Sequence, residues 1–520
     1  MGSIPREEET LVDLTIVGGG PTGLLTGYLA ESLGVSVCII DAKEGPLELG
    51  RADAMNARTQ QVLEVVGILD DLLPEGITCN TSSTFAEGDF KSRQSHWWTG
   101  LEHCYRKNFL MLGQPVIEQA LAQKLKAKIS YGETVSTIAE DKAGVTVTTS
   151  KGRTIRSKYA VGADGARSTV RNALDISFTG TKPEMIWAVL DTFIETDFPV
   201  CSEIITFQLN GQSRVSWIPR ERNMARFYIL LDGEITQEKA ENSIREHMAP
   251  HRVDFKKTEW FSTFDVKERI AGTFVSKSGD GRIILAGDAA HVHSVNGGQG
   301  LNTGVADSFA LAWRLAEVLT NDKLSQASVD KLIKSYDIER RTVAQGVIDV
   351  AAALVRDTVH TAKQYVSTIE KNAGYITGMG VSYDGTGSPL VEGTTAGFWT
   401  AGRRCPDVYL TPSSSEQEPK RLYELVAGKY GKHLVLKIGR QEARGAAPAD
   451  GLKDVARFFR VIPHKAEPRT MTDPEDSSSV FSAEWVGEDD EFVVVVRPDM
   501  YIGYVGQGEG WKEYLAYLTQ

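Results

Sequence analysis

The chain has 520 residues, of which 57 are basic and 69 acidic, so its formal net charge is −12. At about 150 residues per domain this length corresponds to roughly three domains, and the 41% of hydrophobic residues and 24% of charged residues are typical of a globular protein. The acidic balance argues against a general nucleic-acid-binding protein and against attachment to anionic membranes by charge.

Neither a membrane span nor a disulfide framework is predicted. The sequence has no run of about eighteen apolar residues, and its first ten residues, MGSIPREEET, lack the apolar core of a secretory signal. The cysteines are scattered and form no CxxC pair, which argues against a zinc ribbon. We therefore expect a cytoplasmic protein with reduced thiols. The cysteines are Cys38, Cys79, Cys104, Cys201 and Cys405.

The first motif in the chain is a βαβ unit. A strand is predicted over Val12–Val17, a helix over Leu24–Leu33 and a second strand over Val35–Ile40. Between the first strand and the helix, Gly18, Gly20 and Gly23 form the pattern G-x-G-x-x-G, and Asp41 follows eighteen positions after the last of these glycines. Such glycines let backbone N–H groups approach a pyrophosphate at the helix start, and the acid accepts hydrogen bonds from a ribose. This arrangement predicts dinucleotide binding.

Two later segments contain a strand that runs into glycine and aspartate. In Tyr159–Arg171 an apolar strand leads to Asp164-Gly165, which by itself is also compatible with a simple turn and helix cap. In Arg282–Asn302 a strand leads to Gly287-Asp288, followed by the glycine-rich loop Gly297–Gly300 and a long helical pattern from near Leu301. A metal site formed by Asp288, His291 and His293 is disfavoured, because their spacing fits no usual zinc or iron pattern, and no metal is expected.

Together these three segments resemble the FAD-dependent group A aromatic hydroxylases of the para-hydroxybenzoate hydroxylase fold, over residues 12 to about 345. The resemblance implies an α/β FAD-binding domain of the glutathione-reductase-like, Rossmann-like type. In the family the first motif holds the ADP part of FAD, the Asp-Gly motif lies near the pyrophosphate, the Gly-Asp motif binds the ribityl chain and the glycine-rich loop wraps the isoalloxazine. The residues implied to bind FAD are Gly18, Gly20, Gly23, Asp41, Arg51, Gln114, Asp164, Gly287, Asp288, Gly298, Gly300, Leu301 and Asn302.

Residues 50–67, GRADAMNARTQQVLEVVG, resemble the fungal phenol 2-monooxygenase branch of this family. In that branch the aspartate of the GRAD stretch is the catalytic base toward the phenolic hydroxyl, which corresponds to Asp53 here, and the arginine, Arg51, lies close to the flavin. From the residues alone, a helix N-cap or a loop carboxylate is the favoured interpretation of Asp53, and the surrounding motif is what favours the catalytic role.

A second branch feature is the Arg-x-Tyr pattern of a strand predicted over Ala225–Leu231. Arg226 and Tyr228 match it, and two residues that lie two apart on a strand face the same side. The resemblance implies that both converge on the substrate. An exposed arginine and a core tyrosine on an edge strand remain the alternative, and Arg220 is a weaker candidate for the same pocket.

Two departures from related patterns are visible. The family usually has proline before the glycine-rich loop, where this chain has Ser294-Val295-Asn296, and this difference affects the expected position of attack on the ring more than flavin binding. The halogenase branch carries W-x-W-x-I-P, but here Val215 stands where the first tryptophan would be, ahead of Ser216-Trp217-Ile218-Pro219. Halogenation is therefore disfavoured.

The predicted domains are an FAD-binding domain with packing helices over 1–174 and 281–395, and an inserted antiparallel β-sheet substrate domain over 175–280. Residues 396–520 contain helices over 421–430, 452–459 and 509–518 and strands over 433–438 and 492–506. This order resembles the thioredoxin-like C-terminal domain of the phenol hydroxylase branch, and without CxxC no thiol redox chemistry is expected.

The resemblance implies an FAD-dependent monooxygenase that uses NADPH or NADH and O2 to hydroxylate a phenolic substrate, by ortho or decarboxylative hydroxylation through a flavin C4a-hydroperoxide. Asp53, Tyr228 and Arg226 are the catalytic candidates, and Tyr228 and Arg226 would position the substrate oxygen or a carboxylate. The alternatives are an oxidase, epoxidase or dearomatising hydroxylase of secondary metabolism, and a non-catalytic flavoprotein redox partner. A homodimer is expected, with no nucleic-acid or membrane partner.

Overall fold

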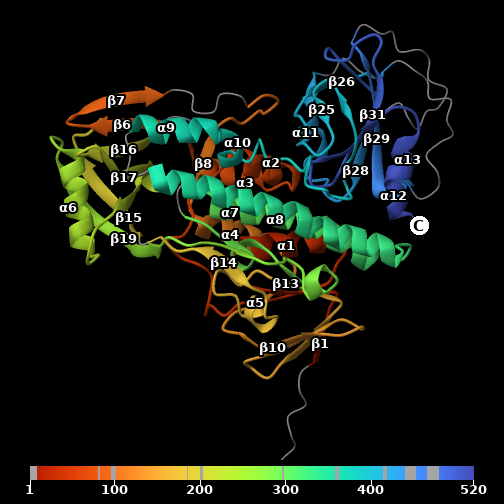
Figure 1. The fold of residues 1–520 in the computed structure, drawn as a ribbon, viewed down its shortest axis with the longest axis horizontal. Helices are drawn as coiled ribbons and strands as arrows, with labels where there is room; N and C mark the ends of the chain where they lie inside the picture. Colours follow the sequence, from red (N-terminus) through yellow and green to blue (C-terminus); the bar gives the residue numbers. More distant parts are fainter. Residues whose placement is uncertain are drawn as a thin grey trace, which may run out of the picture.

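The computed structural model describes residues 9–79, 82–94, 101–183, 185–199, 203–294, 298–357, 362–413, 418–439, 452–464 and 480–519. Two long helices, α7 (Gln299–Thr320) and α8 (Gln326–Asp357), run across the middle of the molecule. A β-sheet unit with helix α6 lies at one end of this helical pair, and the C-terminal unit lies at the other (Figure 1). Four residues named above, Cys201, Val295, Asn296 and Gly297, lie outside the described residues.

The predicted βαβ unit opens a five-stranded parallel sheet, and this confirms the predicted α/β architecture of the first domain. The strand order is β21-β13-β2-β3-β9, and every neighbouring pair is parallel. Four of the strands are buried along their whole length, which is typical of parallel sheets with both faces covered. The strands are β2 (Leu14–Val17), β3 (Val37–Ile40), β9 (Ile129–Ser130), β13 (Tyr159–Gly162) and β21 (Ile283–Leu285).

Helix α1 (Pro21–Ser32) follows β2 and packs on α7 and on α4 (Gln114–Lys124). Three small sheets surround the parallel sheet, with the orders β1-β12-β11-β10, β14-β20-β22 and β4-β8-β5. Their strands are β1 (Glu9–Leu11), β4 (Ala54–Met55), β5 (Ile77–Cys79), β8 (Phe109–Met111), β10 (Val135–Glu140), β11 (Val145–Thr149), β12 (Thr154–Ser157), β14 (Phe178–Thr181), β20 (Glu268–Ala271) and β22 (His291–Val292). The shorter helices are α2 (Ala57–Val65), α3 (Leu69–Leu72), α5 (Thr169–Ala173), α9 (Ala362–Lys371) and α10 (Ala373–Ile376).

The predicted substrate-domain sheet is larger than its inserted segment. It has seven strands in the order β19-β15-β18-β17-β16-β6-β7, and the last two come from residues 82–94 rather than from 175–280. Strand β6 pairs in parallel with β16, which would otherwise be an edge strand with unpaired backbone groups. The strands are β6 (Ser82–Ala86), β7 (Asp89–Gln94), β15 (Ile186–Thr196), β16 (Ile204–Leu209), β17 (Gln212–Pro219), β18 (Ala225–Leu230) and β19 (Val253–Asp265).

The two faces of this sheet have different roles. Helix α6 (Gln237–Met248) covers one face, and the apolar cluster beneath it includes Val215, Trp217 and Phe227. Neighbouring residues on the strands alternate between faces, so Ser216, Ile218, Arg226 and Tyr228 lie on the opposite face. Ile218 packs there against a cluster of the FAD-binding unit that includes Ala54.

The C-terminal unit contains an eight-stranded sheet in the order β23-β32-β31-β28-β29-β30-β26-β27. Its strands are β23 (Glu392–Gly393), β26 (Tyr409–Pro412), β27 (Lys420–Arg421), β28 (His433–Gly439), β29 (Ala456–Pro463), β30 (Val480–Ala483), β31 (Glu491–Val496) and β32 (Ile502–Gly506). The remaining elements are the hairpin of β24 (Thr395–Ala396) and β25 (Trp399–Thr400) and the helices α11 (Leu422–Val426), α12 (Leu452–Val455) and α13 (Gly510–Leu515). The thioredoxin-like character of this unit stays a prediction.

Two elements predicted for the C-terminal unit are wrong. The helix predicted over 452–459 ends at Val455, and Ala456–Pro463 is strand β29, which pairs in parallel with β28 on one side and β30 on the other. The single strand predicted over 492–506 is a hairpin of β31 and β32. Its turn is closed by a hydrogen bond from Met500 N to Arg497 O of 2.9 Å, and Met500 has a positive φ of 58°. Backbone pairing across the sheet decided both elements.

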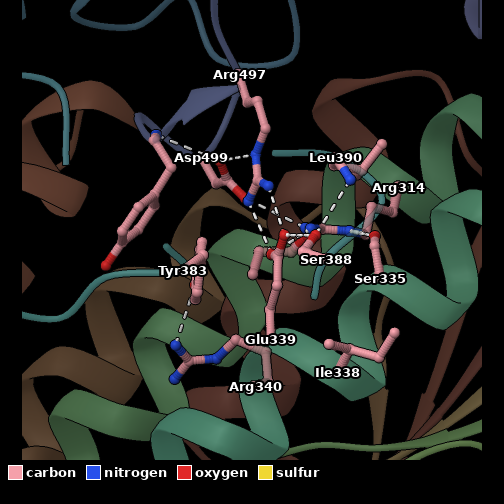
Figure 2. Close-up of polar contacts among 12 residues, drawn as sticks. Arg314, Ser335, Ile338, Glu339, Arg340, Tyr383, Ser388, Leu390, Arg497 and Asp499 are labelled. Atoms are coloured by element: carbon pink, nitrogen blue, oxygen red, sulfur yellow. Dashed lines mark hydrogen bonds and ion pairs between the residues drawn. The ribbon is translucent and has the colours of Figure 1, made fainter. Parts of the chain in front are cut away.

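A buried ionic network joins the C-terminal unit to the two long helices (Figure 2). Both guanidinium nitrogens Nη1 and Nη2 of Arg497 donate to Glu339 of α8, and Nη2 also donates to Asp499 at 2.6 Å. Arg314 of α7 donates to the same two carboxylates, at 2.6 Å to Glu339 and 3.2 Å to Asp499. Burial disfavours the charged carboxylate of Asp499, but the two arginines outweigh it and lower its pKa to about 2. Two positive charges therefore balance two negative charges inside the protein.

No helix among the described residues is long and apolar enough to span a bilayer.

His433 of β28 makes folding sensitive to acid. Its side chain is fully buried, and burial lowers its pKa to about 3. Below about pH 6.5 the unfolded chain binds a proton at this ring that the folded protein does not bind, so stability is full above that pH and falls as the pH decreases. We expect His433→Gln to flatten the decline between pH 6.5 and 4 by about 1.4 kcal/mol per pH unit, measured by denaturant unfolding.

The matched control for this experiment is His464→Gln, which changes an exposed histidine directly after β29. The control is expected to keep the slope of the original protein. An unchanged slope in His433→Gln would show that the buried ring takes up its proton without unfolding.

Candidate active site

The glycine-rich turn between β2 and α1 lies against the Asp-Gly motif. Gly18 has φ = 114°, and a Cβ at this position would overlap the backbone of Ala163 and Asp164. Asp41, at the end of β3, accepts hydrogen bonds from Gly19 N at 2.5 Å and Lys43 N at 2.7 Å. The first predicted motif therefore folds as a compact turn, with Asp41 beside the start of α1.

Asp164 organises the second motif through its carboxylate. It accepts hydrogen bonds from Ser168 Oγ at 2.5 Å, Thr169 N at 2.7 Å and Val170 N at 3.1 Å, and so satisfies two free N–H groups at the start of α5, whose N-cap is Ser168. Arg171 of that helix donates to Ala289 O at 2.8 Å, next to the Gly-Asp motif. The three motifs, which are far apart in sequence, are thus in mutual contact. The carboxylate of Asp164 holds the shape of its own loop through these hydrogen bonds.

The third motif is held from α7 and α8. Gly287 N donates to Asp307 Oδ2 at 2.9 Å, and the same carboxylate is paired with His291 Nε2 at 2.8 Å and Arg340 Nε at 2.7 Å. His291 is therefore held in place by the carboxylate of α7. The Asp288 side chain is exposed to open space beside this turn.

The start of α7 positions the segment that contains Asp53. Gly298 is the N-cap of α7, and Asn302 in its first turn donates to Ala54 O at 2.9 Å and accepts from Asn56 N at 2.9 Å. Asn302 thus anchors this segment through its side chain, and Leu301 packs into the hydrophobic core. Both were predicted to contact the cofactor, and their side chains are occupied by protein contacts.

The donors at these turns fit FAD. Among the residues that the structure describes, no side chain hydrogen-bonds at the N-cap of α1 or α7, so backbone N–H groups there are open to a pyrophosphate or to the polar edge of a flavin. Cβ atoms placed at Gly20 and Gly300 would meet no atom within 4 Å. Gln299 Nε2 and Ser294 Oγ are buried, with no hydrogen-bond partner among the described residues. The dinucleotide would be held by Gly18–Gly23, Asp41, Gly287-Asp288 and the start of α7.

Arg51 and Asp53 lie on a segment with an unusual backbone. Gly50 and Arg51 both have positive φ, at 79° and 67°, and a Cβ at Gly50 would overlap the ring of Trp260. Gln114 fixes the segment from the other side, because Gln114 N donates to Ala52 O at 2.9 Å and its Oε1 accepts from Ala52 N at 3.2 Å. Gln114 therefore contributes to the site as a support of the GRAD stretch.

The structure brings Asp53 and Arg226 together. Arg226 Nη1 lies 3.3 Å from Asp53 Oδ2 and also donates to the carbonyl of Arg51. Both side chains are buried, with exposed fractions of 5% for Asp53 and 0% for Arg226. The N-cap alternative for Asp53 is wrong, since Asn56 caps α2 by accepting from Thr59 N at 2.9 Å.

A residue that sequence reasoning missed, Asp191 of β15, pairs with Arg226. Its Oδ1 accepts from Arg226 Nε and its Oδ2 from Arg226 Nη2, both at 2.6 Å. Arg220 is buried in the same cluster, 3.4 Å from Asp191 Oδ2 and 2.6 Å from Glu221 Oε1. The sequence signal that could have found Asp191 is its residue type, because aspartate is rare in strands and Asp191 interrupts an apolar strand.

Electrostatics keeps Arg226 charged and Tyr228 neutral. Burial disfavours the guanidinium cation, but the facing carboxylates of Asp53 and Asp191 outweigh it and raise the pKa of Arg226 well above its ordinary value. Burial, together with the charge of Asp53, also raises the pKa of Tyr228. Tyr228 therefore keeps its phenolic proton and is available as a hydrogen-bond donor.

The predicted role of Arg226 toward a substrate carboxylate does not match its surroundings. Each of its three guanidinium nitrogens already contacts a protein oxygen, from Asp191, Asp53 or the Arg51 backbone. Arg220 is likewise engaged by Glu221 and Asp191. Trp217, the remaining tryptophan of the halogenase-like stretch, packs on the other face of the sheet.

The fold and the site define an FAD-binding protein built like the flavin-dependent aromatic hydroxylases. A family model described as FAD binding domain matches residues 11–351, which is more than half of the chain. The chain therefore belongs to this family.

Curated relatives and solved structures agree with this assignment. The chain is 29% identical over 403 residues to a phenol 2-monooxygenase of Aspergillus fumigatus, covering 72% of this chain and 66% of that protein. It is 28% identical over 524 residues to the 3-hydroxybenzoate 4-monooxygenase of Comamonas testosteroni, covering 90% of this chain and 80% of that protein. The ternary complex of aklavinone-11 hydroxylase with FAD and aklavinone has the same fold, with a TM-score of 0.76, 23% identity and coverage of 98% and 99%.

Proposed function

We propose that this protein is an FAD-dependent monooxygenase that uses NADPH or NADH and O2 to act on a phenolic aromatic substrate. The reaction is an ortho hydroxylation or a decarboxylative hydroxylation. The observation that carries the proposal is the placement of a buried carboxylate, Asp53, and a neutral phenol donor, Tyr228, beside the segment anchored by the start of α7. The relatives named as phenol 2-monooxygenase and 3-hydroxybenzoate 4-monooxygenase support the same reaction class.

The protein's own residues act on the substrate oxygen. Bound FAD supplies the redox chemistry that activates O2. Asp53 accepts the proton of the substrate phenol, which makes the ring more nucleophilic, as a general base within hydrogen-bond reach would. Tyr228 donates a hydrogen bond to the resulting phenolate oxygen and holds the ring in place. Arg226 holds the GRAD segment through the Arg51 carbonyl and Asp53.

The assay that tests this proposal measures NADPH and NADH oxidation by the yellow holoenzyme across a panel of phenols and hydroxybenzoates, with mass analysis of the products. We expect a stimulating substrate to gain one oxygen. Rapid NADPH or NADH oxidation in which no compound of the panel gains oxygen would favour an oxidase. Bound FAD without stimulation by any phenol would favour a redox partner and contradict the proposal.

Within that panel, uncharged phenols are expected to be better substrates than hydroxybenzoates. The buried arginines Arg226 and Arg220 already pair with carboxylates of the protein. A substrate carboxylate would find neither of them free to pair with it, and burying an unpaired charge is costly. The measurement compares kcat/KM for 3-methylphenol and 3-hydroxybenzoate. A preference of tenfold or more for the acid would show that another cation receives it.

We further propose a cytoplasmic homodimer built from the FAD-binding domain, the β-sheet substrate domain and the C-terminal unit. The thiols of Cys38, Cys104 and Cys405 are buried and form no disulfide, which supports a reducing compartment. Light scattering coupled to size-exclusion chromatography tests the dimer, and a monomeric mass would contradict it.

A further inference from the structure

A carboxylate outside the predicted site shapes the surroundings of Asp53. Asp191 lies in the middle of β15, is 2% exposed, and receives two parallel hydrogen bonds of 2.6 Å from Arg226. Bidentate pairs of this kind fix the plane of the guanidinium as well as its position. Asp191 is not in the GRAD stretch, in the Arg-x-Tyr strand or in any of the FAD motifs.

Sheet register places this pair. Asp191 is the direct cross-strand partner of Arg226 on one side and of Trp260 on the other. The guanidinium carbon of Arg226 lies 5.2 Å from the centre of the Trp260 ring, whose edge covers Gly50. Three adjacent strands therefore hold one planar group against the segment that carries Asp53.

The geometry leaves one nitrogen of Arg226 for that segment. With Nε and Nη2 taken by Asp191, Nη1 is directed at the Arg51 carbonyl and at Asp53 Oδ2, 3.3 Å away. Asp53 Oδ2 is buried and accepts no hydrogen bond from the described residues. Arg226 thus attracts the Asp53 carboxylate without occupying the lone pairs that a proton transfer needs.

We propose that Asp191 is a positioning residue for the hydroxylation step, which orients Arg226 so that Asp53 is held in place but free to accept the substrate proton. This inference rests on the proposed function of Asp53 as the base. Asp191 also neutralises the charge of Arg226. Without that carboxylate, the arginine turns toward Asp53, hydrogen-bonds it and makes it a weaker proton acceptor.

The test uses Asp191→Asn, which keeps the size of the side chain and removes its charge. We expect FAD to stay bound and the rate of product formation to fall at least tenfold, with more NAD(P)H consumed per product. The deficit should shrink at least threefold for a ring-fluorinated analogue of the substrate, whose phenol loses its proton more easily. A general packing defect would slow both substrates equally, and that result would overturn the proposal.

The charged groups Arg51, Arg220 and Glu221 and the neutral phenol of Tyr228 also lie around Asp53, so the pH dependence of the rate is compared between variants. The dependence of the rate on pH should differ between Asp191→Asn and the original protein, because an unpaired Arg226 interacts more strongly with the Asp53 carboxylate. An unchanged pH profile together with an unchanged rate would contradict the inference.

Two further variants complete the experiment. Asp191→Glu keeps the charge but displaces the guanidinium by one methylene, so it should also lose coupled product, and it decides the question if the asparagine variant does not fold. Glu259→Gln is the matched control, since it removes a carboxylate of β19 that pairs with Arg222 at 2.8 Å. If the original protein forms no hydroxylated product, the proposed function fails; if it does and Asp191→Asn equals it, this inference alone fails.

Discussion

Replacing Asp53 by asparagine is expected to slow hydroxylation by about 10²- to 10⁴-fold, the contribution typical of a positioned general base. The amide keeps the shape of the side chain but accepts no proton. Leu112 N donates to the Asp53 carbonyl at 2.9 Å, a backbone contact that the substitution leaves intact. FAD binding should therefore be unchanged, and NAD(P)H oxidation should continue with little product.

The measurement is product formed per NAD(P)H consumed in stopped-flow and steady-state assays, with FAD content checked by absorbance. Asp70→Asn, at an exposed position on α3, is the matched control and is expected to behave like the original protein. Full coupled activity in Asp53→Asn would remove Asp53 from the mechanism. Loss of FAD in this variant would assign it to cofactor binding instead.

Arg497→Met is expected to destabilise the protein by about 3–5 kcal/mol, the cost of breaking a buried ion pair by removing one partner. Arg497 is fully buried, and its loss leaves Glu339 and Asp499 with Arg314 as the shared guanidinium partner. The network spans α7, α8 and the β31–β32 turn (Figure 2). We therefore expect the C-terminal unit to lose its attachment to the long helices before the parallel sheet unfolds.

Denaturant unfolding of the holoenzyme measures this loss, at saturating FAD so that ligand binding contributes equally. The control, Arg403→Met, removes an arginine that is 63% exposed and pairs with Asp384 at 3.3 Å, and should change stability by less than about 0.5 kcal/mol. The double variant Arg497→Met/Glu339→Leu should cost less than the sum of the two single changes, because each charge is then removed together with its partner. Additive costs would show that the pair is not coupled.

Much of the FAD-binding half could be predicted from local patterns. Each of the three cofactor turns follows an apolar strand: the glycines at 18, 20 and 23, the Asp-Gly turn at 164 and the Gly-Asp turn at 287. Neighbouring residues therefore encode the strand, the turn and the helix together. The roles of individual side chains were less predictable. Asn302 and Gln114 are expected at the cofactor, and no local pattern indicated that their side chains also hold the backbone of residues 52–56.

The C-terminal unit shows why local patterns misled. ARFF continues an apparently helical stretch, but strands on both sides recruit it into the sheet as part of β29. The hairpin β6–β7 joined a sheet formed mainly by residues more than a hundred positions later. Pairing energy between distant strands is absent from any sequence window.

By itself, the sequence determined the dinucleotide fold and the three cofactor turns, because each depends on residues close together in the chain. The candidates Asp53, Arg226 and Tyr228 came from its resemblance to the phenol 2-monooxygenase branch. Only the tertiary structure decided what those candidates contact. Asp191 and Arg226 are 35 positions apart and Arg226 and Arg51 are 175 apart, and these pairs meet because β15 and β18 align in register and fold over the GRAD segment. The packing of distant strands determines which residue pairs with a buried charge. The free-energy cost of burying that charge is offset only by an opposite charge that is close in space.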